Sequence, residues 1–366
     1  MMQPSSEGDF TFSADTPFVL EAGGQLQPVT LRYAMYGQLS PRRDNVIMVC
    51  HALSGSARIA DWWADMFGVH GAFDTSRYCF LCSNVIGSCY GSTGPSSENP
   101  RTRRPWGADF PLVTIADMVR AQARLLDHLG ITQLKAVLGG SIGGMQTLQW
   151  AIEFPSRVQA AIAIGCTPLS AMGLALNHLQ RQAILNDPGF AGGNYQEQPV
   201  AGLALARAIA MLSYKSAELF TQRCSRIPDR SGEDPYRSLK ERFDIAGYLD
   251  HQGEKFVGRF DANSYLTLSK AMDLFDPARQ YGSEENALRR IRAKVLLIGI
   301  TSDWLFPAAD VRAWAERMQA AGVNCEYAEL QSDHGHDGFL ADPQGLTDLL
   351  APVLLDRAKA RVLNMR

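Results

Sequence analysis

Apolar and polar residues form two kinds of segment that alternate along most of this chain. Five short apolar runs, rich in β-branched residues, are typical of strands buried on both faces. These runs span residues 45–53, 78–87, 134–140, 158–165 and 294–300. Helix-length segments separate several of the runs, so the pattern predicts an α/β fold with a mostly parallel sheet flanked by helices.

The segment "VTIADMVRAQARLLDHLGI" (residues 113–131) predicts an amphipathic helix between the second and third runs. Its apolar residues recur at helical spacing and define one face. They are Ile115, Met118, Val119, Leu125, Leu126 and Leu129. Thr114 is suited to cap the first turn of this helix, and Gly130 is suited to end it.

A long helical stretch interrupts the alternation between residues 169 and 288. Three blocks in it are rich in good helix formers, and segments containing Pro and Gly separate them. The blocks span residues 173–187, 202–223 and 264–276. We therefore predict a sheet domain built from residues 1–168 and 289–366, with a helical insertion at residues 169–288 between its two parts.

The charge balance argues against some classes of partner. The 366 residues include 35 basic and 38 acidic side chains, for a net charge of −3, so nothing favours binding to nucleic acid. No apolar run reaches the roughly eighteen residues that suggest a membrane span, and the N-terminus lacks a signal-peptide pattern. We expect a cytoplasmic protein without a membrane segment.

The seven cysteines are an odd number, which fits reduced and scattered thiols better than a disulfide framework. Cys79 and Cys82 form a CxxC pair within the predicted strand "YCFLCSNV". Side chains three apart on a strand point to opposite faces of the sheet. We therefore expect buried thiols at these positions, and neither a metal site nor a redox motif.

Four glycines surround Ser141 in "VLGGSIGGMQTLQW" (residues 137–150). The GxSxG pattern follows a predicted strand and precedes a predicted helix, which is the context of a nucleophilic serine held on a tight turn. Such a turn leaves no room for bulky neighbours, so glycines flank the serine. Glycine-rich turns also serve packing alone or bind phosphate, but GxGxxG does not fit here and no P-loop lysine follows.

A nucleophilic serine needs a histidine as base and a carboxylate behind it, in the chain order serine, acid, histidine for this architecture. Asp303 follows the run at 294–300 and is the candidate acid, with Asp310 as a weaker competitor. His334 and His336 lie in a loop after one further predicted strand. Their spacing does not choose between them, and no cluster of further ligands suggests a metal site.

Two backbone N–H groups would have to bind the negative oxygen of the tetrahedral intermediate. One comes from the residue after the nucleophile, Ile142. The other comes from the loop after an early strand, where "HALSGS" (residues 51–56) makes Leu53 the candidate donor. We interpret His51 as a residue that shapes this loop and not as a base.

With these residues in place, the sequence resembles the homoserine O-acetyltransferases, a group of acyltransferases within the α/β-hydrolase fold. Motifs from about residue 12 to the last predicted helix carry the resemblance. They are "HALSGSA", "CSNVIGSCYGSTGPSSENP", "DFPLVTIADMVRAQ", "GGSIGGMQTLQW", "RFDANSYLTLSKAMDLFD", "SDWLFP" and "GHDGFL". Several long motifs in one order are far more specific than GxSxG alone. The histidine of the family's "GHD" matches His336.

The resemblance implies an α/β-hydrolase fold with an inserted helical lid, and a two-step transfer of an acetyl group. Ser141 would attack the thioester of acetyl-CoA, with His336 as the base and Asp303 behind it. L-homoserine would then enter, accept the acetyl group on its γ-hydroxyl and leave as O-acetyl-L-homoserine. This reaction would be a step towards methionine. Acetyl-CoA is a substrate in this scheme, and no bound cofactor or metal is implied.

The resemblance also implies how the amino acid is held. The family's carboxylate-binding arginine and its companion tyrosine match Arg207 and Tyr214, which are seven residues apart and so share a helix face. The acid that would hold the substrate ammonium matches Asp337. The lid would exclude water from the acyl-enzyme. The family forms homodimers through this region, so we expect a homodimer.

Some features depart from the family or leave alternatives open. Ile142 replaces a common methionine, and Ser88 stands in "VIGSCYG" where glycine is common. Related chemistry would use succinyl-CoA or serine, or would hydrolyse esters or thioesters, whereas a non-catalytic binding module would need a broken triad. No motif identifies the residues that hold the nucleotide of CoA. Arg181 and Lys215 are candidates only as basic residues of the insertion.

Overall fold

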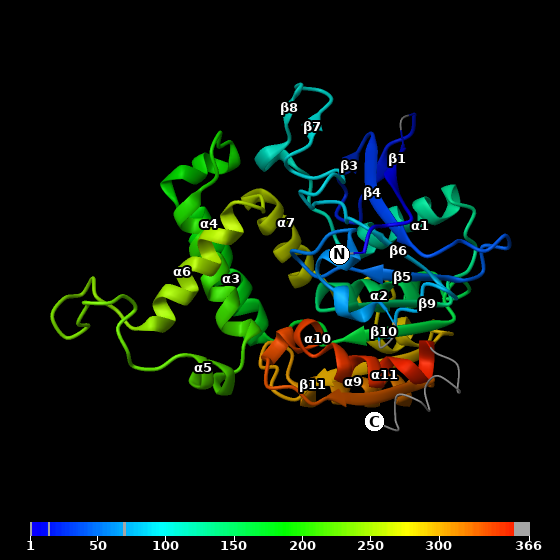
Figure 1. The fold of residues 1–366 in the computed structure, drawn as a ribbon. Coiled ribbons are helices and arrows are strands. Elements are labelled where there is room, and N and C mark those ends of the chain that lie inside the picture. Colours follow the sequence, from blue (N-terminus) through cyan, green and yellow to red (C-terminus); the bar gives the residue numbers. More distant parts are fainter. Residues whose placement is uncertain (1, 14, 69–70, 355–366) are drawn as a thin grey trace.

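An eight-stranded sheet forms the core of the larger part of the molecule, on the right in Figure 1. The structure is a computed structural model that describes residues 2–13, 15–68 and 71–354. In sheet order the strands are β1 (Ser6–Phe12), β4 (Val29–Tyr36), β6 (Cys79–Ser83), β5 (Val46–Cys50), β9 (Ala136–Gly140), β10 (Ala160–Ile164), β11 (Lys294–Ile300) and β12 (Cys325–Leu330). The strands from β6 to β12 are parallel, and β1 and β4 add an antiparallel edge. The predicted α/β fold with a mostly parallel sheet is confirmed.

Each of the five apolar runs contains one strand of the parallel part, namely β5, β6, β9, β10 or β11. The antiparallel strands β1 and β4 escaped the sequence analysis because their residues alternate between more and less exposed positions and form no continuous apolar run. Two small hairpins complete the strands. They are β2 (Phe18–Val19) with β3 (Gln25–Leu26), and β7 (Glu98–Asn99) with β8 (Arg104–Pro105).

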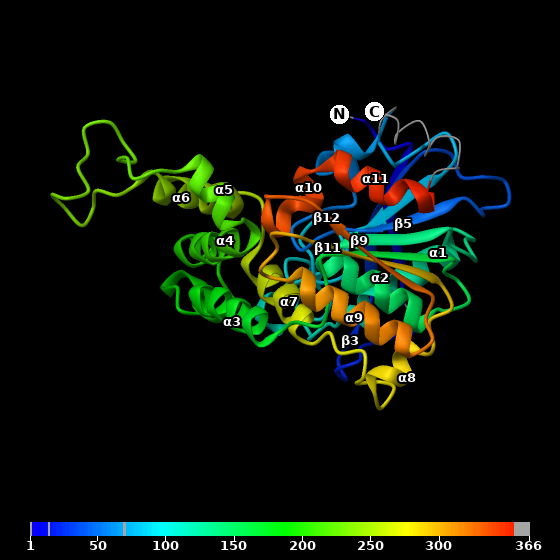
Figure 2. The same ribbon diagram turned by 90° about the horizontal axis from the view of Figure 1, so that it is seen from below.

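The parallel strands are buried on both faces because helices cover each side of the sheet (Figure 2). On one face lie α1 (Ile115–His128), α2 (Ile142–Glu153) and α9 (Ala308–Ala320). On the other lie η1 (Ile59–Asp61), η2 (Ala64–Met66), α10 (Gly338–Ala341) and α11 (Pro343–Leu354). Cys79 belongs to the first core and Cys82 to the second, as the period of a strand requires.

Helix α1 begins and ends where the sequence predicts. The Thr114 side chain accepts a hydrogen bond from the N–H of Asp117, and the Asp117 carboxylate accepts one from the N–H of Thr114. This capping box satisfies two backbone donors that the first helical turn would leave unpaired. Gly130 follows the helix with a φ of 65°, which favours glycine.

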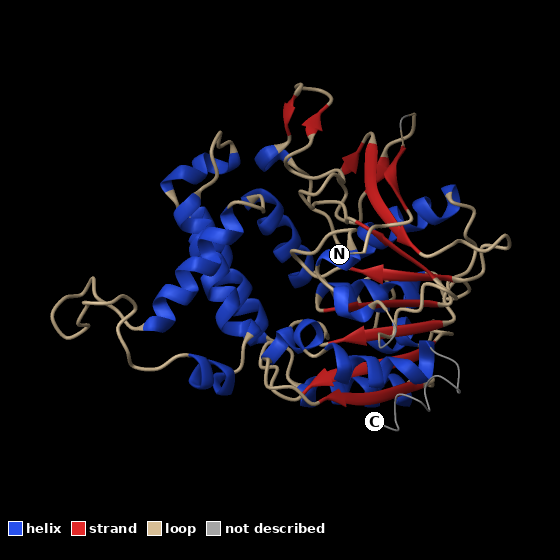
Figure 3. Ribbon diagram, in the orientation of Figure 1, coloured by secondary structure: helices blue, strands red, loops and turns tan. Residues whose placement is uncertain are grey.

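Between β10 and β11 the chain leaves the sheet and forms a group of helices that we call the lid. Most of them lie beyond the carboxyl ends of the parallel strands (Figure 3), but the last and short one (Glu284–Leu288) lies near α9 (Figure 2). Their bounds are α3 (Ala171–Leu185), η4 (Pro188–Gly193), α4 (Val200–Tyr214), α5 (Ala217–Arg223), α6 (Asp244–Val257), α7 (Ala262–Asp273) and α8 (Glu284–Leu288). Short η3 (Gly107–Asp109) and η5 (Gly335–Asp337) lie outside the lid segment.

Two of the lid helices, α6 and α8, were not predicted, and the predicted block 202–223 is divided into α4 and α5. Glycines within α6 obscured its helical pattern, because glycine is a poor helix former. Gly253 is needed there, since a Cβ atom at that position would lie 2.8 Å from the carbonyl oxygen of Ala204 on α4. Close packing of α6 against α4 therefore requires glycine at position 253.

The cysteines form no disulfide, and Cys79 and Cys82 are both fully buried. Burial raises the pKa of the Cys79 thiol to about 11. Across the described ranges, no group of three or more His, Cys, Asp or Glu side chains is arranged to hold a metal ion. No helix within those same ranges is sufficiently long and apolar to cross a membrane.

Candidate active site

Ser141 lies on the tight turn between β9 and α2. Its φ of 59° and ψ of −128° are unusual for a residue other than glycine. The turn packs against the end of β5, so that a Cβ atom at Gly139 or Gly143 would lie 2.5 or 2.2 Å from the carbonyl oxygen of Cys50. Only glycine fits at these two positions without moving the backbone, which explains why glycines crowd around the serine.

Asp303 and His336 meet beyond the carboxyl ends of β11 and β12. Nδ1 of His336 lies 2.6 Å from Oδ2 of Asp303, and both side chains are almost fully buried. Oδ1 of Asp303 accepts hydrogen bonds of 2.9 Å from the backbone N–H groups of Leu305 and Phe306. These bonds fix the orientation of the carboxylate towards the imidazole.

The alternative acid and histidine lie elsewhere. Asp310 is an exposed residue in the first turn of α9. His334 has its Nε2 atom 4.0 Å from Oδ1 of Asp342, and it does not line the cavity that contains Ser141. His336 does line that cavity. The geometry therefore brings Asp303 and His336, and not their neighbours, to the site of Ser141.

Aromatic rings enclose the imidazole of His336. The ring centroids of Tyr214, Phe306 and Phe339 lie 5.8, 5.3 and 5.7 Å from its own. Nε2 of His336 is buried and has no hydrogen-bond partner in the part of the chain that the structure describes. A buried imidazole nitrogen without a partner, in the same cavity as a serine hydroxyl, is suited to accept a proton during a reaction.

The pKa of His336 is set by opposing effects. Burial alone would lower this pKa, because it disfavours the charged imidazolium. The negative charge of Asp303 and its hydrogen bond raise the pKa, and the charge of Asp337 adds to them. The net pKa is raised above the ordinary value of 6.5, so this imidazole is a stronger base than a free histidine.

The loop after β5 carries Leu53, which lines the cavity together with Ser141. The side chain of His51 holds this loop through two hydrogen bonds. Its Nε2 atom accepts a hydrogen bond of 3.2 Å from the N–H of Val85, so Nδ1 carries the proton and donates to the carbonyl of Ala52 at 2.8 Å. Burial lowers the pKa of His51 to about 4, which keeps it neutral. Ile142 opens α2 and is buried.

The cavity has a volume of about 800 Å³ and extends from Ser141 to the lid. Arg207 and Tyr214 line it from α4, and Asp337 lines it beside His336. The Arg207 guanidinium lies over the rings of Tyr214 and Phe256, with its carbon 5.4 and 4.9 Å from their centroids. It forms no ion pair within the described ranges, so its charge is available to an anion in the cavity.

Lys215, which the sequence suggested only as a candidate for the nucleotide of CoA, and Ser302, which it did not single out, make positioning contacts at the site. Nζ of Lys215 lies 2.9 Å from Oδ2 of Asp337, which leaves Oδ1 of that carboxylate without a protein partner among the described residues. Ser302 donates a hydrogen bond of 2.5 Å to the carbonyl of Ser332 and accepts one of 2.8 Å from the N–H of Gly335. Ser302 thus joins the loop of Asp303 to the loop of His336. Its position directly before Asp303 is the only feature of the sequence that could have indicated this role.

This architecture is found in known proteins. The chain matches the family described as alpha/beta hydrolase fold over residues 45–343, and it therefore belongs to that fold family. It is also similar in structure to an acetylester hydrolase from Corynebacterium glutamicum, with a TM-score of 0.78 and 27% sequence identity over 100% of each chain.

More specific relatives lie within this fold. A homoserine O-acetyltransferase from Symbiobacterium thermophilum is 50% identical over 341 residues, which cover 90% of this chain and 89% of the relative. The crystal structure of a homoserine O-acetyltransferase from Bacillus anthracis has a TM-score of 0.89 and 28% identity, and covers 97% of this chain and 99% of the other. The chain belongs to the homoserine O-acetyltransferase family.

Proposed function

We propose that this protein transfers the acetyl group of acetyl-CoA to the γ-hydroxyl of L-homoserine. The observation that carries the proposal is one cavity that holds a nucleophile and a base together with an arginine that has no acidic partner among the described residues. Ser141 and His336 suit acyl transfer, and Arg207 suits the carboxylate of an amino acid. The high identity to homoserine O-acetyltransferases supports the same conclusion.

In the first step, Oγ of Ser141 attacks the carbonyl carbon of the thioester, and its proton passes to Nε2 of His336. The oxygen of the tetrahedral intermediate accepts hydrogen bonds from the N–H groups of Leu53 and Ile142. The carbon–sulfur bond then breaks, and His336 returns the proton to the CoA thiolate. Asp303 holds the imidazolium in orientation and stabilises its charge throughout this step.

In the second step, L-homoserine enters the cavity and reverses the chemistry. Nε2 of His336 accepts the proton of the γ-hydroxyl, the γ-oxygen attacks the acyl carbon, and the ester bond to Ser141 breaks as the serine regains its proton. The planar guanidinium of Arg207 can hold the substrate carboxylate with two parallel hydrogen bonds. Tyr214 stacks beside it. Oδ1 of Asp337 remains available to the substrate ammonium.

Replacement of Arg207 by alanine removes the cation that we assign to the substrate carboxylate. Loss of a charge-assisted hydrogen-bonded pair typically costs about 1.5–3 kcal/mol, so the KM for L-homoserine should rise about 10- to 100-fold. The rate of CoA release in the first turnover should change little. An exposed lid arginine outside the cavity serves as control, because Arg223→Ala leaves the cavity intact. A wild-type KM for homoserine in Arg207→Ala would contradict the assignment.

The reaction itself is tested by combining donors with acceptors. CoA release is measured from acetyl-CoA and from succinyl-CoA, each with L-homoserine, with L-serine or with no acceptor, and the products are weighed by mass spectrometry. We expect acetyl-CoA turnover that depends on homoserine and yields O-acetyl-L-homoserine. A preference for succinyl-CoA or serine would keep the mechanism and change the substrates.

Hydrolysis is the second candidate function, since an acetylester hydrolase shares this architecture over its full length. Both activities would use the same serine, histidine and acid, and they differ in whether water or an amino acid accepts the acyl group. CoA release from acetyl-CoA at the same rate without any acceptor would favour the hydrolase. Arg207, which has no acidic partner among the described residues, favours the transferase, because an esterase has no need of an amino-acid clamp.

The proposed function also includes an oligomeric state and a cellular location. We expect a cytoplasmic homodimer without a resident cofactor or metal, in which CoA enters and leaves as substrate and product. Helices α3 and α4 of the lid expose several large apolar side chains, and a second copy would cover part of them. They are Met172, Leu174, Leu179 and Leu185 on α3, and Val200, Leu205 and Leu212 on α4. Light scattering at micromolar concentration would contradict the dimer if it gave the mass of one chain.

A further inference from the structure

The donor proposed above carries phosphate groups as well as the reacting thioester, and these groups need cations. The two basic residues that the sequence suggested, Arg181 and Lys215, are already neutralised. Nη2 of Arg181 lies 2.5 Å from Oδ2 of Asp273, and Nζ of Lys215 lies 2.9 Å from Oδ2 of Asp337. Neither residue lines the cavity of Ser141. The sequence-based choice of these two residues therefore does not fit the structure.

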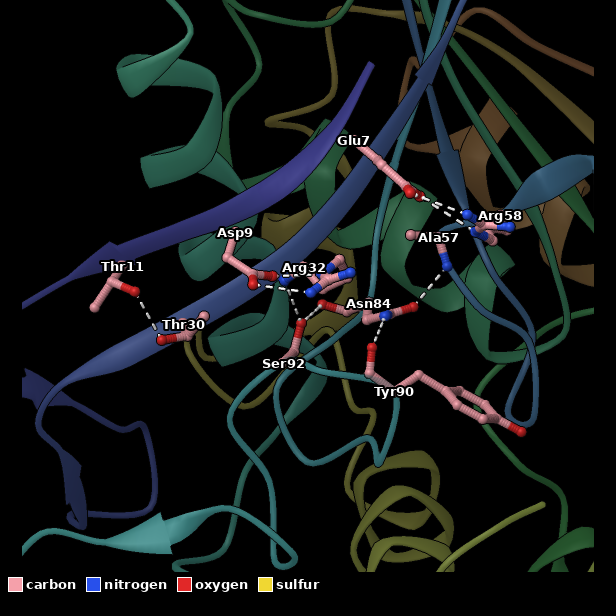
Figure 4. A network of polar contacts seen from close by, with 10 residues as sticks. All are labelled: Glu7, Asp9, Thr11, Thr30, Arg32, Ala57, Arg58, Asn84, Tyr90 and Ser92. Carbon is pink, nitrogen blue, oxygen red and sulfur yellow. Dashed lines mark hydrogen bonds and ion pairs between the residues drawn. The ribbon is translucent and has the colours of Figure 1, made fainter. Parts of the chain in front are cut away.

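The wall of the cavity on the sheet side also offers little free positive charge. Figure 4 shows the guanidinium groups of Arg58 and Arg32 turned towards the carboxylates of Glu7 and Asp9, at 2.9 and 2.5 Å. Asp61 lines the same wall and has no ion pair in the described part of the chain. This wall is therefore close to neutral or negative, and it would not attract a phosphate.

The opposite wall belongs to the lid and is positive. Lys255 near the end of α6 and Arg259 just beyond it both line the cavity, and neither forms an ion pair with any described residue. Both side chains are exposed to solvent, so they lie where the cavity opens. Two cations without counter-ions on one wall concentrate positive potential at the entrance.

Arg259 is held in place by contacts that leave part of its guanidinium free. Nη1 donates hydrogen bonds of 3.1 and 3.0 Å to the carbonyl of Ser54 and the hydroxyl of Tyr90, and Nη2 donates one of 3.4 Å to Oγ of Ser54. The group also stacks on the ring of Phe256, 5.0 Å from its centroid. A guanidinium has five N–H donors, so Nε and one hydrogen of Nη2 remain available to a ligand.

We propose that Lys255 and Arg259 bind phosphate groups of the acyl donor at the entrance of the cavity. The inference rests on the proposed transfer from acetyl-CoA. Arg259 supplies fixed donors that match phosphate oxygens, and Lys255 supplies a mobile point charge. The bonds from Arg259 to Ser54 also join this phosphate site to the loop that carries Leu53, so donor binding steadies the proposed oxyanion hole.

The test compares two acetyl donors that share the thioester but differ in their phosphates. The kcat/KM for acetyl-CoA is divided by that for S-acetyl-N-acetylcysteamine, which contains no phosphate. In Lys255→Gln this ratio should fall about tenfold, because one charge-assisted contact is lost only with the phosphorylated donor. Lys255→Arg should keep the ratio near that of the wild type. A ratio in Lys255→Gln within twofold of the wild type would overturn the proposal.

Two further variants complete the design. Lys240→Gln removes an exposed lid lysine that does not line the cavity, and its ratio should match the wild type. An equal fall in this control would show a general charge effect and overturn the specific site. Arg259→Gln should lower the ratio as well, with an additional loss of activity towards the truncated donor through Ser54 and Leu53. An unchanged ratio in that variant would contradict the role of Arg259.

The same assay can show which phosphate of the donor Lys255 binds. It can also distinguish a failure of the phosphate site from a failure of the proposed function. With acetyl-dephospho-CoA as a third donor, loss of the Lys255 effect assigns this side chain to the 3′-phosphate, and its persistence assigns it to the diphosphate. Acetylation of homoserine by the truncated donor leaves the proposed function standing even where the phosphate site fails. Absence of homoserine acetylation with every donor would instead remove the proposed function.

Discussion

Ser141→Ala should abolish the acyl-enzyme and almost all turnover. Alanine lacks the hydroxyl that forms the covalent bond, and loss of a triad nucleophile commonly costs about 10⁶-fold in kcat. Incubation with acetyl-CoA, followed by mass spectrometry of the intact protein, should show an acetyl adduct in the wild type and none in the variant. The fold should survive, because alanine tolerates the φ of 59° about as well as serine does.

The neighbouring histidines give this experiment a matched control. His336→Gln should also prevent acylation, because no other histidine among the described residues lines the cavity of Ser141. His334→Gln should acylate normally, since His334 lies outside the cavity beside Asp342. A normal adduct in Ser141→Ala, with an unchanged melting temperature, would overturn the assignment of the nucleophile.

Asp303→Asn should lower kcat by about 10⁴-fold while leaving the fold intact. The amide has the shape of the carboxylate but lacks its charge, so it stabilises the imidazolium poorly and can donate a hydrogen bond that favours the wrong tautomer of His336. Asp310→Asn is the matched control, because Asp310 is exposed on α9 and touches neither residue. A loss below tenfold in Asp303→Asn would contradict its role.

Asp303→Asn should also change the pH dependence of kcat/KM. His336 must be neutral to accept a proton, and Asp303 raises its pKa above 6.5. In the wild type, kcat/KM for acetyl-CoA should therefore rise as the pH increases through a pKa above 6.5. Without the charge of Asp303 this pKa falls, so the acidic limb of the profile should move to lower pH in Asp303→Asn. An acidic limb that does not move would mean that another group titrates there.

Local sequence determined the elements of the core. Continuous apolar runs predicted the parallel strands, because strands covered on both faces have no polar side. The glycines around Ser141 predicted the turn, since the approach of Cys50 excludes any Cβ atom at Gly139 and Gly143. The position of Asp303 just after the apolar run 294–300, within the chain order serine, acid, histidine, made it the preferred acid over Asp310. The sequence shows the strands and the turn directly, because burial on both faces requires continuous apolar runs and a close backbone approach requires glycine.

Features that depend on distant partners needed the tertiary structure. The choice between His334 and His336 followed from resemblance, and the position of Asp303 gives its physical reason. Helix α6 was not predicted because its glycines weaken a helical pattern, and one of them, Gly253, is required by close packing against α4. Whether a cation is free to bind a ligand depends on which carboxylates the fold brings near it. Spacing along the chain does not contain that information. Only the fold distinguishes Arg181 and Lys215, which form ion pairs, from Arg207, Lys255 and Arg259, which form none with the residues that the structure describes.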